Sequence, residues 1–492
     1  MFSTNTTKES SFHWFLRGIL ILVFTILVAK VAELQIIKGN YFRSLAEGNR
    51  IRKVTLIAPR GKVLARGGEA LVTSREVKKR LLFNSESGFE KSSELDGPGE
   101  IVTDWVRVYP LGAKFAHVSG YLGQISEDEV GKVNPKCPEK GPKKTQDLVG
   151  RSGLEEEYEC VLGGTNGEEL IEVDNMGRKV RILGKKDPIP GGDLKTNIDY
   201  GLQQKVATSL EGNKGAAIIT DLEGHVLALV SSPSYDPNEL LKENNSQYVS
   251  SLFNDRNLPL FNRVVGGVYH PGSVFKPLVT IAALEEGKID KNFTFTDPGV
   301  IKVGAFSYSN WYLSQYGKTE GTIGITRAIA RSTDTFFYKV GEILGPDNIS
   351  IWAKKIGLDS TTGIDIPGEV SGLVPSPAWK LQYNKEPWFL GNTYHFSIGQ
   401  GDLAVTPVEM NKMLLAFASS GSLCEPRIAS RDDSLCKKIK ISPDNFSIVK
   451  DGMTQACSGG GTGYTFFDFK PQVACKTLVN CFCNTRPQFV QA

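Results

Sequence analysis

The longest apolar run in the chain lies close to its N-terminus. Residues 18–29 are hydrophobic or small, and Thr25 is the one polar interruption. Extended to residues 12–32, the run reaches the length that an α-helix needs to cross a bilayer. Arg17 and Lys30 lie near its ends, where long basic side chains reach the interface. The pattern therefore predicts a membrane-spanning helix over residues 12–32.

The same apolar core would also suit a cleavable signal peptide. Cleavage requires small residues after the core, but residues 31–37 continue the hydrophobic pattern as an amphipathic helix. We therefore predict an uncleaved signal anchor, with residues 1–11 as a cytoplasmic tail. No second apolar run of spanning length follows in the sequence, so we expect a single-pass protein whose bulk lies outside the cytoplasm.

Beyond the anchor, the hydrophobic pattern predicts two strands separated by a long polar segment. Residues 50–57 and 102–108 have the composition of strands. Residues 66–100 are rich in Gly, Ser, Glu and Lys, which indicates a loop. Residues 185–192 contain two prolines and form the predicted linker between domains.

A turn at residues 150–153 precedes a predicted short helix. Ser152 stands at the expected N-cap position, and Glu155 follows three residues later, which is the spacing of a capping box.

The second half of the chain mixes strands and helices. Residues 202–210 have a helical pattern, and residues 215–230 predict a β-hairpin that turns at Glu223-Gly224. Helical patterns dominate to about residue 356, and a strand returns at residues 471–475. These patterns predict an α+β fold with more than one domain, in which an antiparallel sheet is combined with helices.

Composition excludes few functions. A length of 492 residues suits two or three domains, and a net charge of +3 indicates no particular partner. Basic and aromatic residues are not interleaved as in nucleic-acid-binding segments, so no nucleic acid is expected. The five histidines have no metal-ligand spacing, so we predict no metal site. Among eight cysteines, Cys137 with Cys160, or Cys424 with Cys436, could form disulfides in an oxidising compartment, which the sequence leaves open.

Ser273 and Lys276 are the strongest candidates for catalysis. They lie one turn apart at the start of a predicted helix, where a serine nucleophile and a lysine base can meet. Residues 269–272 predict a turn, Pro277 suits a first helical turn, and residues 278–284 supply an apolar face. The positive end of this helix would favour an oxyanion or a carboxylate near Ser273.

Two further segments follow in the order that such a site needs. Ser332-Thr333-Asp334 precedes an apolar helix at residues 335–338, and Lys476-Thr477 ends the predicted strand at residues 471–475. Two other serine–lysine pairs, Ser434 to Lys437 and Ser447 to Lys450, lack the apolar helical context.

Two segments imitate functional motifs. Residues 318–321 imitate the lysine–threonine motif but come before Ser332, and residues 399–401 lack the lysine and helix of a phosphate loop.

The ordered trio resembles that of penicillin-binding proteins and serine β-lactamases. Taken with further segments, the chain is similar to a class B penicillin-binding protein, a peptidoglycan D,D-transpeptidase. The aspartate at position 334 makes the second motif similar to that of the elongation-type subgroup, penicillin-binding protein 2. The segments that carry the wider resemblance are residues 49–52, 58–61, 150–155, 232–238, 261–263, 399–401 and 406–407.

The resemblance implies a fold and a setting. It implies a pedestal or dimerisation-type domain over residues 33–187 and a transpeptidase domain over residues 188–492, with a central antiparallel sheet and helices. It also implies a bacterial plasma-membrane location, peptidoglycan stem peptides as substrates, β-lactams as inhibitors, a membrane glycosyltransferase as partner, and no cofactor.

The resemblance also implies residue roles. Ser273 would attack the carbonyl of D-alanyl-D-alanine, and Lys276 would be its base if burial and positive charge lower its pKa. Ser332 would bridge the lysine and the departing nitrogen, and Asp334 would position this network. Lys476 and Thr477 would bind the terminal carboxylate of the substrate.

Two departures from the family pattern stand out. Ala65-Arg66 replaces an aspartate–arginine pair, and Leu478 replaces the glycine that follows Lys476-Thr477. Residue 478 faces the same side of a strand as Lys476, so leucine would occupy cleft space and misplace the oxyanion N–H, nominally of Val479. We expect the match to end after about residue 477, leaving the domain without its last elements, aggregation-prone and poor at binding penicillin, as a frameshift, assembly error or pseudogene would.

Three other functions compete with the transpeptidase. A β-lactam sensor would carry several spans, and a β-lactamase or carboxypeptidase is usually smaller and secreted. A catalytically impaired truncated product or scaffold is the third alternative.

Overall fold

The computed structural model describes residues 7–84, 88–97, 100–145, 147–174, 178–242, 244–431, 435–478 and 488–490. The chain forms two compact units. The first comprises Met1–Pro59, Arg75–Val106 and Gly164–Gly191, and the second comprises Arg60–Ser74, Arg107–Gly163 and Gly192–Ala492.

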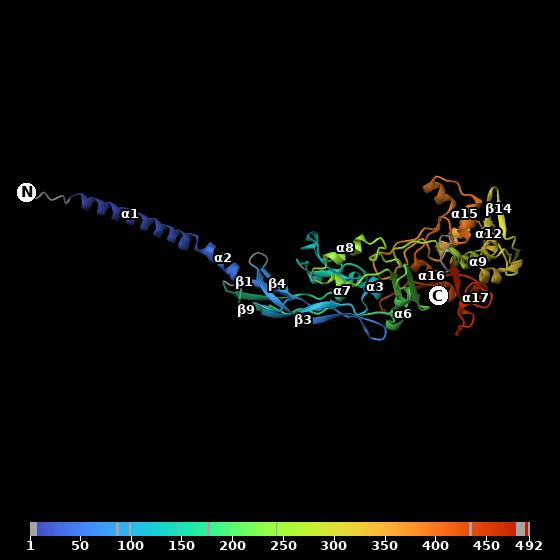
Figure 1. The fold of residues 1–492 in the computed structure, drawn as a ribbon, viewed down its shortest axis with the longest axis horizontal. Helices are drawn as coiled ribbons and strands as arrows, with labels where there is room; N and C mark the ends of the chain where they lie inside the picture. The colour runs from blue at the N-terminus through green and yellow to red at the C-terminus, as the bar shows by residue number, and fades with distance from the viewer. Residues whose placement is uncertain are drawn as a thin grey trace, which may run out of the picture. The chain divides into compact units, whose positions relative to one another are not determined.

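The first unit begins with the predicted apolar helix. Helix α1 (Thr7–Ala32) continues through a π-helical turn (Glu33–Ile37) and is followed by α2 (Gly39–Arg50); α1 is the blue helix in Figure 1. Within the described residues, Phe12–Ile37 is the one stretch long and apolar enough to cross a membrane, and none of it is buried within the protein. The predicted single spanning helix is thus confirmed in length and composition.

An antiparallel sheet follows the helices of the first unit. Strand β1 (Ile51–Leu56) pairs with β8 (Gly167–Val173), which pairs with β9 (Lys179–Lys186). A small core of Val54, Leu81, Ile171 and Val173 lies on one face of the unit's strands. The predicted strand at residues 50–57 is therefore confirmed.

The loop predicted over residues 66–100 is wrong. Residues in this region form β3 (Ala70–Asn84) and β4 (Gly88–Ser92), and β5 (Glu100–Val108) also pairs with β3. Strand pairing satisfies the backbone groups here although apolar positions are sparse. The ion pair between Lys91 and Asp104, at 3.1 Å, adds a contact that the hydrophobic pattern could not signal.

The second unit contains the predicted hairpin. Strand β11 (Gly215–Thr220) pairs with β12 (Val226–Ser232), and Gly224 in the turn has a φ of +89°, which glycine adopts without steric cost. Helix α6 (Tyr200–Leu210), capped by the Asp199 side chain, packs against β12.

The remaining strands of the second unit are short. Its other strands form two-residue to four-residue pairs: β2 (Val63–Leu64) with β10 (Leu194–Lys195) and the start of β3, β6 (Leu122–Gln124) with β7 (Leu148–Gly150), β13 (Thr294–Thr296) with β16 (Thr322–Gly324), β14 (Val300–Val303) with β15 (Phe306–Ser309), β17 (Ser422–Cys424) with β18 (Cys436–Lys438), and β19 (Lys476–Leu478) with β20 (Gln488–Val490). The other α-helices are α3 (Ala116–Ser119), α4 (Gly153–Glu157), α5 (Glu159–Leu162), α7 (Pro237–Leu240), α8 (Ser246–Asn254), α9 (Lys276–Glu285), α10 (Trp311–Tyr316), α11 (Ile325–Arg331), α12 (Asp334–Leu344), α13 (Pro346–Lys355), α14 (Pro377–Trp379), α15 (Leu390–Ser397), α16 (Pro407–Ala418) and α17 (Pro443–Ala456).

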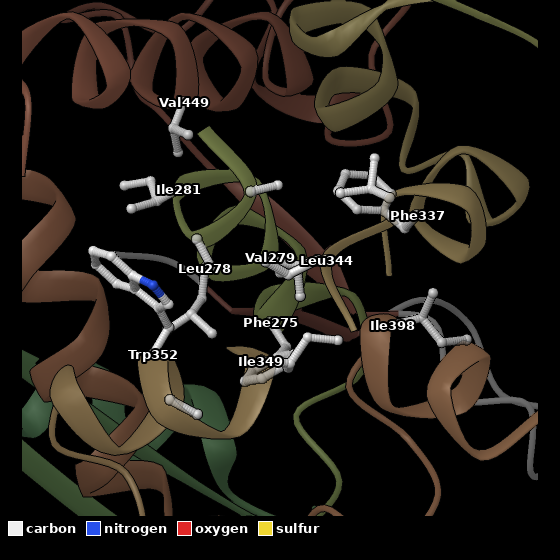
Figure 2. Close-up of a cluster of buried hydrophobic side chains, with 14 of the residues drawn as sticks. Phe275, Leu278, Val279, Ile281, Phe337, Leu344, Ile349, Trp352, Ile398 and Val449 are labelled. Carbon is white, nitrogen blue, oxygen red and sulfur yellow. The ribbon is translucent and has the colours of Figure 1, made fainter. Parts of the chain in front are cut away.

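Helix α9 lies at the centre of the largest hydrophobic core. Its residues from Lys276 to Ala283 are all buried, so the helix is enclosed on every side rather than amphipathic. Figure 2 shows Leu278, Val279 and Ile281 of α9 among side chains of α12, α13 and α17, such as Leu344, Trp352 and Val449. This packing fixes the segment that carries Ser273 and Lys276.

A buried charge cluster joins segments of the second unit that are distant in sequence. Glu155 is fully buried, and its two carboxylate oxygens accept hydrogen bonds from Arg60, at 2.8 and 3.1 Å, and from Arg107, at 2.6 Å. Burial lowers the pKa of Arg60, but the charges of Glu155 and Glu159 outweigh that effect and hold it above its ordinary value. Glu155 therefore pairs with arginines, and the predicted capping box with Ser152 does not form.

Three disulfides link described residues of the second unit. Cys137 is bonded to Cys160, and Cys424 to Cys436, which are the two pairings that the sequence left open. The third bond joins Cys457 at the end of α17 to Cys475, next to β19.

We predict that the Glu155 cluster is a principal source of stability in the second unit. Glu155→Ala removes the carboxylate partner of the buried Arg107 and one of the two carboxylate partners of Arg60, so it should lower the free energy of unfolding by about 3–5 kcal/mol. Urea denaturation in detergent, followed by circular dichroism, measures the change. Glu156→Ala, on the exposed side of the same helix, is the matched control. Equal effects of the two substitutions would contradict the prediction.

Candidate active site

Ser273 lies in a tight turn that leads into α9. Residues Gly272–Phe275 form a single 3-10 turn, and Lys276 is the first residue of α9, with Pro277 beside it. The predicted helix start and the place of proline in its first turn are confirmed. Ser273 is 7% exposed, so its hydroxyl lies at the edge of the core.

The glycine pair at residues 399–401 supports this turn. The N–H of Gly272 donates to the carbonyl of Gly399 at 2.8 Å. Gly399 has a φ of +76°, and a Cβ there would lie 2.1 Å from the carbonyl oxygen of Gly272. Only glycine fits, because the two backbones touch. This segment is therefore a structural support for the serine turn.

Lys276 is the most enclosed charged group of the site. It is 0% exposed, and its Nζ donates to Asp334 Oδ1 at 2.6 Å, to the Ser332 carbonyl at 2.9 Å and to Ser332 Oγ at 3.1 Å. The Phe337 ring lies 5.2 Å away and adds a cation–π contact. The structure thus brings together three of the predicted catalytic residues from two separate segments.

Ser332 reaches Lys276 because of an unusual backbone conformation. It is the C-cap of α11, with a φ of +54°, which costs about 1 kcal/mol for a residue other than glycine. This left-handed residue ends α11 and allows α12 to start at Asp334. Its carbonyl and hydroxyl oxygens both accept from Lys276. The strained backbone at Ser332 thus places both oxygens where they can hold the Lys276 side chain.

Residues outside the motifs hold Asp334. The N–H of Trp311 donates to Asp334 Oδ2 at 3.3 Å, and the N–H of Asp334 donates to Asn310 Oδ1 at 3.3 Å. The indole of Trp311 also donates to the Arg331 carbonyl at 2.9 Å. Asn310 and Trp311 are not predictable from the sequence, because no spacing rule connects α10 to a motif 23 residues later.

Lys476 and Thr477 form the other side of the site. They belong to β19, which packs against the serine turn, and each is 2% exposed. Burial lowers the pKa of Lys476 well below its ordinary value; the charge of Lys276 lowers it further, while Asp334 acts in the opposite direction. Thr477 Oγ1 donates to Thr462 Oγ1 at 2.8 Å. Asp334 pairs with Lys276 and acts on Lys476 only through its charge, so an incoming anion is favoured beside Lys476.

The strand predicted before Lys476 begins later than expected. Residues 471–475 are not a strand, and β19 starts at Lys476 itself. The N–H of Cys475 donates to the Met453 carbonyl at 3.0 Å, and its side chain is bonded to Cys457. These contacts attach the segment to α17 instead of a partner strand.

Two predicted features of the site, a contact between Ser273 and Lys276 and an oxyanion donor, are not seen among the described residues. Among the described residues, no hydrogen bond joins Ser273 to Lys276, although catalytic hydrogen bonds commonly tighten when substrate binds. Val479, the nominal oxyanion donor, lies outside the described residues, as does Ser434.

Ser447 and Lys450 are exposed on α17, so that pair is no site. Residues 318–321 lie in a loop, as predicted.

The fold agrees with comparisons to known proteins. Residues 215–477 match the family model of the penicillin binding protein transpeptidase domain, and residues 89–196 match that of the penicillin-binding protein dimerisation domain. The peptidoglycan D,D-transpeptidase MrdA of Escherichia coli is 31% identical over 94% of this chain and 82% of its own. The MrdA of Acinetobacter baumannii is 33% identical over 84% of this chain and 68% of its own.

Solved structures agree as well. Penicillin-binding protein 2 of Helicobacter pylori, in complex with MreC, has a TM-score of 0.74 and 25% identity over 87% of this chain and 88% of its own. Penicillin-binding protein 2 of Pseudomonas aeruginosa, in complex with WCK 5153, has a TM-score of 0.68 and 29% identity over 87% and 86%. The chain therefore belongs to the class B penicillin-binding proteins.

Proposed function

We propose that this chain is a peptidoglycan D,D-transpeptidase of the penicillin-binding protein 2 type that acts through an acyl-enzyme on Ser273. The observation that carries the proposal is the buried Lys276 amino group, hydrogen-bonded to Ser332 and Asp334 one turn after the serine. Acyl transfer needs a nucleophile, a base beside it and a proton route to the leaving group, and these residues supply each.

In the first half-reaction, Ser273 Oγ bonds to the carbonyl carbon between the two D-alanines of a stem peptide. Lys276 Nζ, in its neutral amine form, takes up the hydroxyl proton of Ser273 and returns it through the Ser332 hydroxyl to the departing amine. The C–N bond breaks and D-alanine leaves. In the second half-reaction, the amine of another stem peptide attacks the ester, the bond to Ser273 breaks, and a proton returns to the serine. Asp334 keeps Lys276 in place throughout.

Lys476 and Thr477 would bind the terminal carboxylate of the donor peptide or the carboxylate of a β-lactam. The charge of Lys276 disfavours the protonated form of Lys476. A carboxylate bound at Lys476 would form an ion pair that offsets this effect. The hydroxyl of Thr477 would add a hydrogen bond. Tight burial of both residues in β19 supports a fixed anchor point for the substrate.

We also propose an extracytoplasmic place for the second unit. Its three disulfides are typical of an oxidising compartment, and the apolar N-terminal helix suits an anchor. Solved relatives include a complex with MreC and a peptidoglycan synthase complex. By analogy, this chain would work in a membrane assembly with a glycosyltransferase that makes the glycan strands.

The dimerisation-domain match favours the transpeptidase over a secreted β-lactamase or carboxypeptidase. A single candidate span in the described residues argues against a multi-span sensor. Deacylation separates the remaining classes: a transpeptidase keeps a penicillin adduct for many minutes, a β-lactamase releases it rapidly, and a scaffold forms none.

We predict that a penicillin acylates Ser273. Peptide mass spectrometry after labelling should find the adduct on the peptide that contains Ser273, and Ser273→Ala should abolish it because the nucleophile is gone. Lys276→Ala should slow labelling by about 10²–10⁴-fold, as loss of a general base does. Ser447→Ala is the matched control and should label like wild type. An adduct on Ser447 or Ser434 would contradict the assignment.

A second variant tests the departure at residue 478. The side chain of Leu478 lies outside the described residues, but the period of two along a strand would place it on the side of Lys476, where glycine would leave more space. Leu478→Gly should therefore speed labelling of Ser273 above that of the wild-type chain. An unchanged rate would contradict the view that leucine obstructs the strand.

We predict a single-pass topology with the second unit outside the cytoplasm. Protease added to intact spheroplasts should remove most of the chain, and before reduction the six paired cysteines should resist alkylation. A chain that is protected from protease would contradict the topology. A mature form without residues 1–30 would contradict the uncleaved anchor.

A further inference from the structure

Asp297 is a buried carboxylate that belongs to none of the three motifs. It is 3% exposed and accepts four hydrogen bonds. Oδ1 accepts from Thr335 Oγ1 at 2.6 Å and from the Gly299 N–H at 2.8 Å; Oδ2 accepts from Asn310 Nδ2 at 2.8 Å and from the Glu320 N–H at 3.0 Å. In the described part of the chain it has no cationic partner within 4 Å.

The four donors keep this carboxylate ionised. Burial alone raises the pKa of Asp297, but the hydrogen bonds from Thr335, Glu320, Gly299 and Asn310 outweigh burial and bring the pKa below its ordinary value. A carboxylate that accepts four hydrogen bonds in a fixed arrangement orients its donors as strongly as they hold it.

Two of the four donors lead directly to Asp334. Thr335 is the next residue in α12. Asn310 bridges the two acids, because its Nδ2 donates to Asp297 while its Oδ1 accepts from the N–H of Asp334. The residue after Asn310, Trp311, donates its N–H to Asp334 Oδ2. The orientation of the Asn310 amide is therefore fixed at one end by Asp297 and used at the other end by Asp334.

Asp334 in turn contacts Lys276 at 2.6 Å. A chain of hydrogen bonds thus runs from Asp297 through Asn310 to Asp334 and then to Lys276, within the second unit. We infer that Asp297 is a positioning residue for acylation, which sets the Asp334 carboxylate, and through it Lys276, at the distance that proton transfer from Ser273 requires. This inference rests on the proposed transpeptidase function.

A purely structural role is the competing explanation. Asp297 also accepts from the Gly299 and Glu320 N–H groups, so it joins the two ends of the segment between β13 and β16. Glu320 in turn pairs with Arg331 at 2.6 Å. Loss of loop packing alone would lower stability but would leave the chemical step unchanged in the folded protein. If Asp297 positions the catalytic groups, its substitution should instead slow the chemical step and leave initial binding through Lys476 and Thr477 unchanged.

The decisive experiment exchanges the two bridging residues. In Asp297→Asn an NH2 group replaces one carboxylate oxygen, so in either amide orientation it faces an N–H donor, of Asn310 and Glu320 or of Gly299. In Asn310→Asp two carboxylates face each other, so both single variants disturb the bridge. In the double variant Asp297→Asn with Asn310→Asp, a donor again faces an acceptor, and Oδ1 of residue 310 still accepts from Asp334. Asp290→Asn, an exposed carboxylate that accepts a local backbone N–H, is the matched control.

Stopped-flow acylation of the full-length protein by a penicillin separates the dissociation constant of the initial complex from the acylation rate constant. We expect each single variant to lower the acylation rate constant about 10-fold to 100-fold, as misplaced catalytic groups do. The dissociation constant should stay within about twofold of wild type, since the carboxylate anchor is untouched. The double variant should recover most of the loss, and Asp290→Asn should match wild type.

Other outcomes overturn the inference. A folded Asp297→Asn protein that acylates at the wild-type rate does so, and so does a double variant no faster than the single variants. If Asp297→Asn does not fold, Asn310→Ala, which leaves Asp297 three of its four donors, gives the same test: a wild-type rate overturns the inference, and a slow rate with an unchanged dissociation constant supports it. A wild-type chain that never forms an adduct overturns the proposed function, and the inference with it.

Discussion

The complete burial of the Lys276 ammonium is the constraint on which the site depends. A buried charge is tolerated only when it is paired and hydrogen-bonded, and here Asp334 and Ser332 supply those partners. Their positions in turn require the left-handed backbone at Ser332, which ends one helix and starts the next. Around them, α9 is enclosed by apolar side chains, so the lysine cannot turn away to solvent. The large core and the catalytic arrangement are therefore one structure.

A second cation makes this arrangement suited to anions. Lys476 reaches the site from β19, a strand attached to α17 through the Cys457–Cys475 disulfide and a backbone hydrogen bond. Its burial beside Lys276 disfavours its own charge until a carboxylate arrives. The lysine that would activate the serine thus lowers the pKa of the lysine that would hold the substrate.

Local features were predictable from the sequence, and contacts between distant segments were not. The start of α9 and the hairpin at Gly224 follow from patterns a few residues long, and the ordered trio identified Ser273, Lys276 and Ser332 as candidates before the structure placed Lys276 beside Ser332. Strand β3 was missed because polar residues dominate its middle, while its buried apolar residues Leu71, Val72 and Leu81 lie towards its ends. Glu155 has the spacing of a capping box, yet it binds arginines 48 and 95 residues away. Asp297 and Asn310 have no motif, since their meaning lies in hydrogen bonds across the fold.

The pH dependence of acylation tests the central claim most directly. If Lys476 binds the ligand carboxylate as a cation with a lowered pKa, the second-order rate constant for penicillin acylation falls as the pH rises through that pKa, because the ammonium is lost. Lys476→Met lacks the titrating group, so its rate constant should be lower at neutral pH and should not show this fall. A wild-type profile without the fall, or the same fall in Lys476→Met, would contradict the account.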